Sequence, residues 1–216
     1  MSIQIGAQRE KLADRAYREL EELIITLRLR PGSILNEPDL CSALEIGRTP
    51  MREALQKLAA ERLVTIQPRR AMIVSEVHAS EHLIVLETRR VLERLIAASA
   101  AKRADKQERE QLRDCAEAIR TAADQGDIDE FMRQDKEFDR ILGQAARNPF
   151  ASQSCQPLQS LSRRFWYYHQ GEAELSIAAD LHTQIMLAVA DGEPEKAADA
   201  SDKLMDYLEA AARKVI

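Results

Sequence analysis

The chain contains few glycine, proline, cysteine and aromatic residues, and it has no long apolar run. Its 216 residues include only seven glycines and seven prolines, while Leu, Ala, Glu and Arg are abundant, which predicts a mostly helical protein. No segment approaches the roughly 20 apolar residues that a membrane-spanning helix needs. We therefore expect a helical protein that does not cross a membrane.

Cysteine is scarce as well. Cys41, Cys115 and Cys155 are unevenly spaced and form no CxxC pair, which predicts reduced thiols and excludes a disulfide framework. The first residues are polar and lack the apolar core of a signal peptide. Both features predict a cytoplasmic location.

The charge is modest overall but unevenly distributed. A net charge of −5 argues against general affinity for nucleic acids. Residues 1–78 nevertheless carry 12 basic and 11 acidic side chains, against 19 and 25 in the remainder. Residues 47–70 alone hold six basic and two acidic side chains. A local basic surface on an acidic protein favours sequence-specific DNA binding.

The most informative segment is residues 47–58, which has the pattern of a short helix entered by a sharp turn. Thr49 is a suitable N-cap and Pro50 suits the first helical position. Arg48 and Arg52 lie at the start of this helix, where positive charge is unfavourable for the helix dipole. Their position indicates an external anion or acceptor, and a DNA phosphate or a guanine edge would meet this need.

The residues around this segment complete a winged helix-turn-helix. A helical pattern over residues 9–28 ends at Pro31-Gly32, and a second short helix is expected after Asn36 as its cap. The helix that starts near residue 49 is then the one that enters the major groove. Strands over residues 63–67 and 72–74 flank a basic turn, predicting a two-stranded wing.

This run of motifs resembles the winged helix of GntR-type bacterial transcription regulators. The similarity covers about the first 75 residues, and the remainder resembles the all-helical ligand-sensing domain of the FadR branch. The resemblance implies a DNA-binding domain over residues 1–76 and an effector-binding and dimerisation domain over 77–216. It also implies a set of DNA contacts: Arg48, Thr49 and Arg52, assisted by the wing residues Arg69 and Arg70. Ala71 departs from the family, which usually has glycine there.

Six amphipathic helices with short connections are predicted in the second domain, forming an antiparallel bundle. Asp105 and Glu108 have the spacing of a capping box. Ser80 is a suitable cap for the first helix, and Asn148-Pro149 is expected to end the third. The expected helices cover residues 80–102, 105–125, 128–147, 151–168, 177–190 and 194–215.

Many FadR-branch proteins bind a divalent metal within this bundle, through an Asp-x-x-x-His pair and two later histidines. Asp135 matches the first position and His182 the second histidine position. Asp139 and Tyr207 stand where the other two histidines are usual. The match is therefore partial, in two of four positions.

Three interpretations of these residues remain open. Asp135, Asp139 and His182 can hold a divalent ion (Mn²⁺, Zn²⁺, Ni²⁺ or Mg²⁺), and so many oxygen ligands favour Mn²⁺ or Mg²⁺. Alternatively the site has no metal, and His182 binds the carboxylates in a polar network that the Tyr207 hydroxyl closes. In the third interpretation, Asp135 and Asp139 face solvent on a charged helix.

Arg89 matches the family position that often meets an anionic ligand, and a guanidinium suits bidentate carboxylate recognition. Its alternative is an intrahelical pair with Glu93, four residues later. The run Phe165-Trp166-Tyr167-Tyr168 holds four of the nine aromatic side chains and lines either a pocket or a core or dimer contact.

The sequence therefore predicts a cytoplasmic, homodimeric transcription regulator and not an enzyme. We expect a repressor that is released by a small anionic metabolite, with Arg89, Asp135, Asp139, His182 and Tyr207 at the effector site. Two alternatives are a constitutive DNA-binding protein without an effector and a metal-dependent enzyme. The sequence does not identify the effector or the operator.

Overall fold

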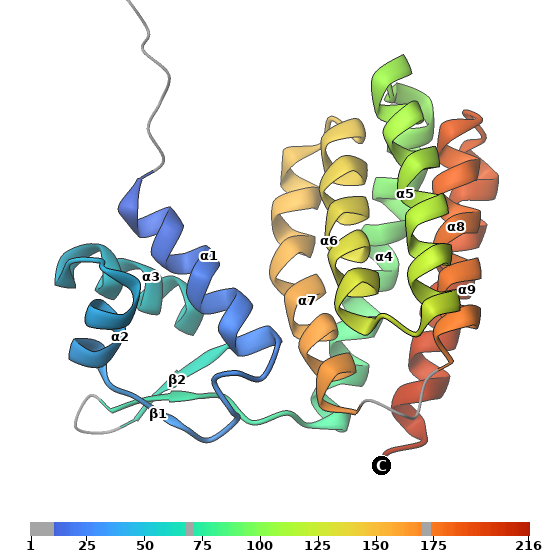
Figure 1. Ribbon diagram of the computed structural model, residues 1–216. Helices are drawn as coiled ribbons and strands as arrows, with labels where there is room; N and C mark the ends of the chain where they lie inside the picture. Colours follow the sequence, from blue (N-terminus) through green and yellow to red (C-terminus); the bar gives the residue numbers. More distant parts are fainter. Residues whose placement is uncertain (1–10, 68–70, 170–173) are drawn as a thin grey trace, which may run out of the picture. The chain divides into compact units, whose positions relative to one another are not determined.

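The computed structural model describes residues 11–67, 71–169 and 174–216, and the chain divides into two compact units, residues 1–77 and 78–216. Figure 1 shows helices and a small sheet in the first unit, and a bundle of long helices in the second. This confirms the predicted fold class. None of the described helices is long and apolar enough to cross a membrane.

The first unit is a winged helix-turn-helix. Its elements are α1 (Leu12–Ile25), β1 (Ile34–Leu35), α2 (Glu37–Leu44), α3 (Arg48–Ala60), β2 (Val64–Ile66) and β3 (Met72–Val74). The strands form an antiparallel sheet in the order β1-β3-β2, in which Val64 lies opposite Val74 and Ile34 opposite Ile73. Strand β1 adds a third strand to the two-stranded wing that the sequence predicts.

The core of the first unit lies between α1 and α3. Leu20 and Ile24 of α1 and Met51, Leu55 and Leu58 of α3 are fully buried, because each helix places its apolar side chains on one face. This packing fixes the direction of α3 and leaves its opposite face exposed.

The first helix is shorter than predicted. It ends at Ile25 instead of residue 28, because Leu27 adopts a left-handed conformation with φ of 60°. The amide of Leu29 then donates to the carbonyl oxygen of Leu23 at 2.8 Å, which closes the helix end.

The second unit is a bundle of six described helices. They are α4 (Ala79–Arg103), α5 (Lys106–Gln125), α6 (Ile128–Ala145), α7 (Pro149–Tyr168), α8 (Leu175–Ala190) and α9 (Pro194–Arg213). Helix α4 packs against α6, α7, α8 and α9, and α5 packs against α6 and α8 (Figure 1). Leu86 and Ile96 are among the side chains of α4 that are buried in the bundle.

Most of these helices begin at a short residue pattern that favours a helix N-terminus. Asp105 and Glu108 form the predicted capping box, in which each side chain accepts the other residue's amide at 2.9 Å. Asn148 caps α7 through the amide of Ala151, so α7 begins at Pro149, two residues before the predicted start. The predicted cap Ser80 is wrong, because α4 already begins at Ala79.

Two arginines of α4 form ion pairs with carboxylates of α9. Arg90 pairs with Asp206 at 2.7 Å and Glu209 at 2.9 Å on α9, and Arg94 pairs with Asp199 and Asp202 on the same helix. These pairs hold α4 and α9 in register along one side of the bundle.

The three cysteines differ in their surroundings. Cys41 on α2 is partly exposed, whereas Cys115 on α5 and Cys155 on α7 are buried. Burial raises the pKa of the Cys115 thiol to about 12 and also raises the pKa of Cys155. Nearby carboxylates act in the same direction on both thiols.

Candidate functional sites

The outer face of α3 presents the side chains predicted to contact DNA. Arg48, Thr49 and Arg52 are exposed in the first turns of the helix, opposite the buried Met51. Arg52 donates through Nε to the carboxylate of Glu37 on α2 at 2.8 Å, and its side chain remains 61% exposed. The structure therefore brings these three residues onto one accessible surface.

The predicted capping role of Thr49 is wrong. Helix α3 begins two residues earlier, at Arg48 with Gly47 as N-cap, and the carbonyl oxygen of Gly47 accepts the amide of Met51 at 3.2 Å. Pro50 is thus the third helical residue, where its missing amide hydrogen costs nothing because first-turn amides have no intrahelical acceptor. The Thr49 side chain is exposed instead, where a ligand can reach its hydroxyl.

The tip of the wing, with Arg69 and Arg70, lies outside the described residues. At the base of the wing, the amide of Gln67 donates to the carbonyl oxygen of Ala71 at 2.8 Å. The predicted DNA contacts of the two arginines therefore stay predictions.

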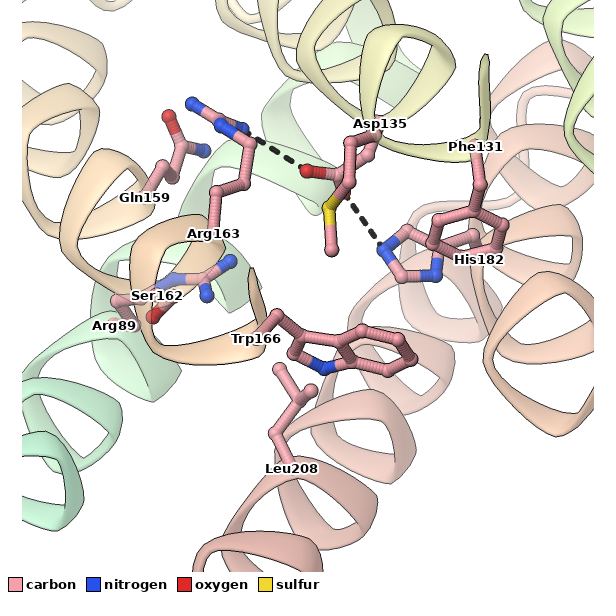
Figure 2. Close-up of a pocket in the computed structure, with 10 residues that line it drawn as sticks. Arg89, Phe131, Asp135, Gln159, Ser162, Arg163, Trp166, His182 and Leu208 are labelled. Atoms are coloured by element: carbon pink, nitrogen blue, oxygen red, sulfur yellow. Dashed lines mark hydrogen bonds and ion pairs between the residues drawn. The ribbon is translucent and has the colours of Figure 1, made fainter. Parts of the chain in front are cut away.

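The bundle contains a small cavity whose empty space is about 370 Å³ when the solvent at its open side is counted. Figure 2 shows the side chains around it, which come from α4, α6, α7, α8 and α9. They combine apolar groups with several charged groups. The lining residues are Arg89, Phe131, Met132, Asp135, Gln159, Ser162, Arg163, Trp166, His182 and Leu208.

His182 on α8 is held between two hydrogen-bond acceptors. Its Nδ1 lies 2.7 Å from the carbonyl oxygen of Ala178, and its Nε2 lies 2.9 Å from a carboxylate oxygen of Asp135 on α6. Because both partners accept hydrogen bonds, this geometry favours the form with hydrogen on both ring nitrogens, the imidazolium. Burial opposes the charged form, but the hydrogen bond and charge of Asp135 outweigh it and raise the pKa of His182.

Arg163 on α7 joins the two predicted carboxylates. Its Nη1 lies 3.0 Å from Asp135 and 2.6 Å from Asp139, and all three side chains are nearly buried (Figure 2 shows the bond to Asp135). Burial favours the neutral form of Asp135, but His182 and Arg163 outweigh it and hold its pKa well below the usual range. Burial and the charge of Asp135 instead raise the pKa of Asp139.

Arg89 lies at the cavity and also forms the intrahelical pair expected from the sequence. It lines the cavity and is only 7% exposed, and its Nη2 also donates to Glu93 at 2.8 Å, four residues later on α4. The same oxygen of Glu93 accepts from Gln159 at 3.1 Å and from the thiol of Cys155. Glu93 therefore holds the Arg89 guanidinium in position at the wall of the cavity.

Tyr207 does not lie at this site. Its hydroxyl accepts the amide of Glu174 at 3.1 Å and donates to the carbonyl oxygen of the same residue at 3.2 Å, just before α8. The adjacent Leu208 lines the cavity instead, because consecutive helical residues point about 100° apart. The predicted polar network is thus closed by Arg163 and not by Tyr207.

The aromatic run of α7 divides between several surroundings. Trp166 lines the cavity, and Phe165 is buried and stacks on His82 of α4 with ring centroids 3.9 Å apart. The Tyr167 hydroxyl donates to Asp129 at 3.1 Å, and Tyr168 is half exposed. Only Trp166 of this run contributes to the cavity.

Both units match known protein families. The FCD domain matches residues 84–207, and the description "Bacterial regulatory proteins, gntR family" matches residues 12–74. The chain belongs to the GntR family. It is a DNA-binding transcription regulator with a C-terminal FCD domain, as the sequence predicts.

Relatives of this GntR-family regulator carry similar descriptions. The HTH-type transcriptional repressor RspR of Escherichia coli (strain K12) is 26% identical over 180 residues, which are 82% of this chain and 79% of RspR. The Nta operon transcriptional regulator of Aminobacter aminovorans is 31% identical over 124 residues, or 56% of this chain and 58% of that one.

Solved structures share the fold of this GntR-family regulator. The structure of E. coli McbR/YncC covers 96% of this chain and 99% of its own, with a TM-score of 0.83 and 20% sequence identity. A GntR regulator from Rhodococcus sp. RHA1 covers 94% of this chain and 98% of its own, with a TM-score of 0.73 and 20% identity. At this identity, the likeness establishes the fold alone.

Sequence reasoning missed the central residue of the site in this GntR-family regulator. Arg163 was not among the residues predicted for the site, although it binds both Asp135 and Asp139. A signal was present, because two aspartates on one buried helix face require a cation, and Arg163 is one of the few basic residues of α7. Ser162 and Gln159 had no such signal.

Proposed function

We propose that this regulator is a cytoplasmic homodimeric repressor, released from its operator by a small anionic metabolite that binds in the cavity of the bundle. The observation that carries the proposal is the presence of two buried guanidinium groups, those of Arg89 and Arg163, in the cavity wall. Guanidinium groups bind carboxylates strongly in surroundings that exclude water.

Two further polar atoms support an oxygen-rich ligand. Within the described part of the chain, Ser162 Oγ and Arg163 Nε are buried and have no hydrogen-bond partner. A buried polar group without a partner is costly, and a ligand that accepts these hydrogens removes the cost. Both residues line the cavity, so a carboxylate bound there fits this demand.

Repression is supported by one of the relatives. The protein with 26% identity over 82% of this chain is described as a transcriptional repressor. Release then requires that the metabolite bind one arrangement of the DNA-binding units more tightly than another. Helix α3 would read each half-site through Arg48, Thr49 and Arg52.

A homodimer is supported by an exposed apolar stripe on α4. Ile84, Val91 and Leu95 recur at helical spacing on one face and are 65%, 71% and 47% exposed. The same face carries Glu81 at one end and Lys102 at the other. An antiparallel second copy of α4 would cover the stripe and place Glu81 near the partner's Lys102, which makes the surface self-complementary.

The effector proposal is tested by unfolding and DNA release. A panel of small carboxylate metabolites is screened by thermal unfolding, where a ligand at 100 times its Kd adds about 2.7 kcal/mol. For a chain of this size we expect a rise in Tm of about 5–10 °C. The same compound should lower the anisotropy of a fluorescent operator bound to the protein.

A pair of matched variants locates the binding site. Ser162→Ala removes an unpartnered buried hydroxyl in the cavity and should weaken the ligand about fivefold. Thr183→Val removes a buried hydroxyl that also has no partner among the described residues but does not line the cavity, so it should leave affinity unchanged. If no carboxylate shifts unfolding or DNA binding, the constitutive alternative gains and the effector proposal fails.

The dimer is tested separately. Val91→Glu places a charge in the exposed stripe and should convert the dimer to a monomer in light scattering, with a large loss of operator affinity. Phe150→Glu is the control, because Phe150 is 83% exposed outside the stripe. A wild-type monomer, or a Val91→Glu dimer, would contradict the proposed interface.

A further inference from the structure

The donor set suggested by the sequence does not converge on one point. A divalent ion in this bundle would need lone pairs of Asp135, Asp139 and His182 directed at a shared position. His182 Nε2 instead faces Oδ1 of Asp135, while Oδ2 of the same carboxylate faces Arg163. Among the residues that the structure describes, no three His, Cys, Asp or Glu side chains form a group suited to a metal ion.

The position between the two aspartates is taken by a guanidinium. A single nitrogen, Nη1 of Arg163, lies 3.0 Å from Oδ2 of Asp135 and 2.6 Å from Oδ2 of Asp139. One donor thus reaches both carboxylates, as a bridging cation does. Arg163 comes from α7 and the aspartates from α6, so this bond also joins the two helices.

Because these side chains are buried, the guanidinium and a metal ion cannot share this position. The side chains of Arg163 and Asp139 are each 8% exposed and that of Asp135 is 14% exposed. In such surroundings two carboxylates require a cation, and charge repulsion is weakly screened. A divalent ion beside the guanidinium would add positive charge to a position that already holds it, and would have to displace Arg163 first.

We propose that Arg163 is the permanent internal cation of this site, that it replaces a bound metal, and that the regulator folds and binds its effector without a divalent ion. The effector part of this statement rests on the proposed function. A carboxylate ligand then meets the guanidinium groups of Arg163 and Arg89 directly, without a metal as intermediary. Its oxygens would accept from Arg163 Nε and Ser162 Oγ, which lack partners among the described residues.

The first experiment measures metal in the wild-type protein. Protein purified without a chelator is analysed by elemental mass spectrometry and then titrated with Mn²⁺, Ni²⁺ and Zn²⁺ by calorimetry. We expect less than about 0.1 equivalent of metal per chain and no saturable binding at this site. Unfolding with and without EDTA should give the same Tm within about 1 °C.

The second experiment creates a metal site by removing the guanidinium that occupies its position. The double variant Arg163→Ala with Asp139→His leaves Asp135, the new imidazole and His182 free to converge, and should bind Ni²⁺ or Zn²⁺ stoichiometrically with a rise in Tm. Asp139→His alone is the matched control. With Arg163 still present, it should bind these ions at least about tenfold more weakly.

Two results would overturn the inference. One is a stoichiometric metal in the wild-type protein that Asp135→Asn removes. The other is equal metal affinity in Asp139→His with and without Arg163, since the guanidinium would then not occupy the position. Circular dichroism at each step verifies folding, and the wild-type measurement decides the question if the double variant does not fold. Neither experiment uses DNA or effector, so their failure leaves the proposed regulator function standing.

Discussion

Arginine has different roles in the two units. On α3 of the helix-turn-helix unit, the Arg52 side chain is 61% exposed and pairs with one surface carboxylate. In the bundle, Arg163 is 8% exposed and bridges two buried carboxylates. Exposed arginines are free to bind a partner at little cost to the fold, whereas a buried arginine is needed for the fold itself. The same residue type therefore serves recognition in one unit and charge compensation in the other.

Removing the buried cation should have the largest effect, a loss of unfolding free energy. Arg163→Ala leaves Asp135 and Asp139 buried together, and breaking such a group costs about 3–5 kcal/mol of unfolding free energy. Urea denaturation measures the loss. Adding Asp139→Asn should recover part of it, because one uncompensated carboxylate is removed. If Arg163→Ala unfolds at the wild-type urea concentration, the contrast between the two units is lost.

The next effect concerns the exposed arginine. Arg52→Ala should lower operator affinity about 10- to 100-fold if the guanidinium contacts a base edge. The urea midpoint should stay at the wild-type value, the opposite of Arg163→Ala. Fluorescence anisotropy at several salt concentrations measures the change. An unchanged affinity and salt dependence would remove Arg52 from the recognition surface.

The sequence could predict these two roles of arginine to different extents. The residues of α3 were found because Arg48 and Arg52 stand at fixed offsets from a helix start, which is a local pattern. The capping box at Asp105 was local for the same reason. Strand β1 was missed, because Ile34–Leu35 is too short to show an alternating pattern and forms only by pairing with β3.

The cavity could be predicted only in part. Asp135 and His182 were identified from the family pattern, and the structure places them 2.9 Å apart. Arg163 lies on a different helix from Asp135, and its approach depends on how α6 and α7 pack, which spacing does not encode. Tyr207 was misplaced for a related reason, since the rotation of α9 decides whether residue 207 or 208 faces inward.

A third effect depends on pH. Burial, then the charges of Arg89 and His169, lower the pKa of His82 to about 3. The fold holds its neutral form, so the associated stability is complete above pH 6.5, the pKa of unfolded histidine, and is lost as pH falls toward 3. At pH 5 the loss from this group is about 2 kcal/mol.

The variant His82→Phe keeps a ring against Phe165 but cannot take up a proton. Its unfolding free energy, measured by urea denaturation from pH 7.5 to 5, should fall less steeply than that of the wild type. Parallel slopes would mean that His82 is not buried in its neutral form.

The smallest effect is expected at the surface pair of α2 and α3. Glu37→Gln removes the charge that holds Arg52, so operator affinity should rise about two- to threefold at low salt. The gain should shrink as salt is added, because exposed charges are screened. Asp39→Asn serves as control, since it removes the same charge from α2 without touching Arg52. An equal gain in both variants would reflect net charge alone.

The distribution of cysteines has a practical consequence for following this regulator in solution. Only the thiolate form of cysteine reacts with alkylating reagents, and burial with a raised pKa keeps Cys115 and Cys155 in the thiol form. The partly exposed Cys41 is therefore a natural attachment point for a fluorophore on α2. The two bundle thiols label only when the bundle opens, so their modification rate reports how often that happens and whether an effector slows it.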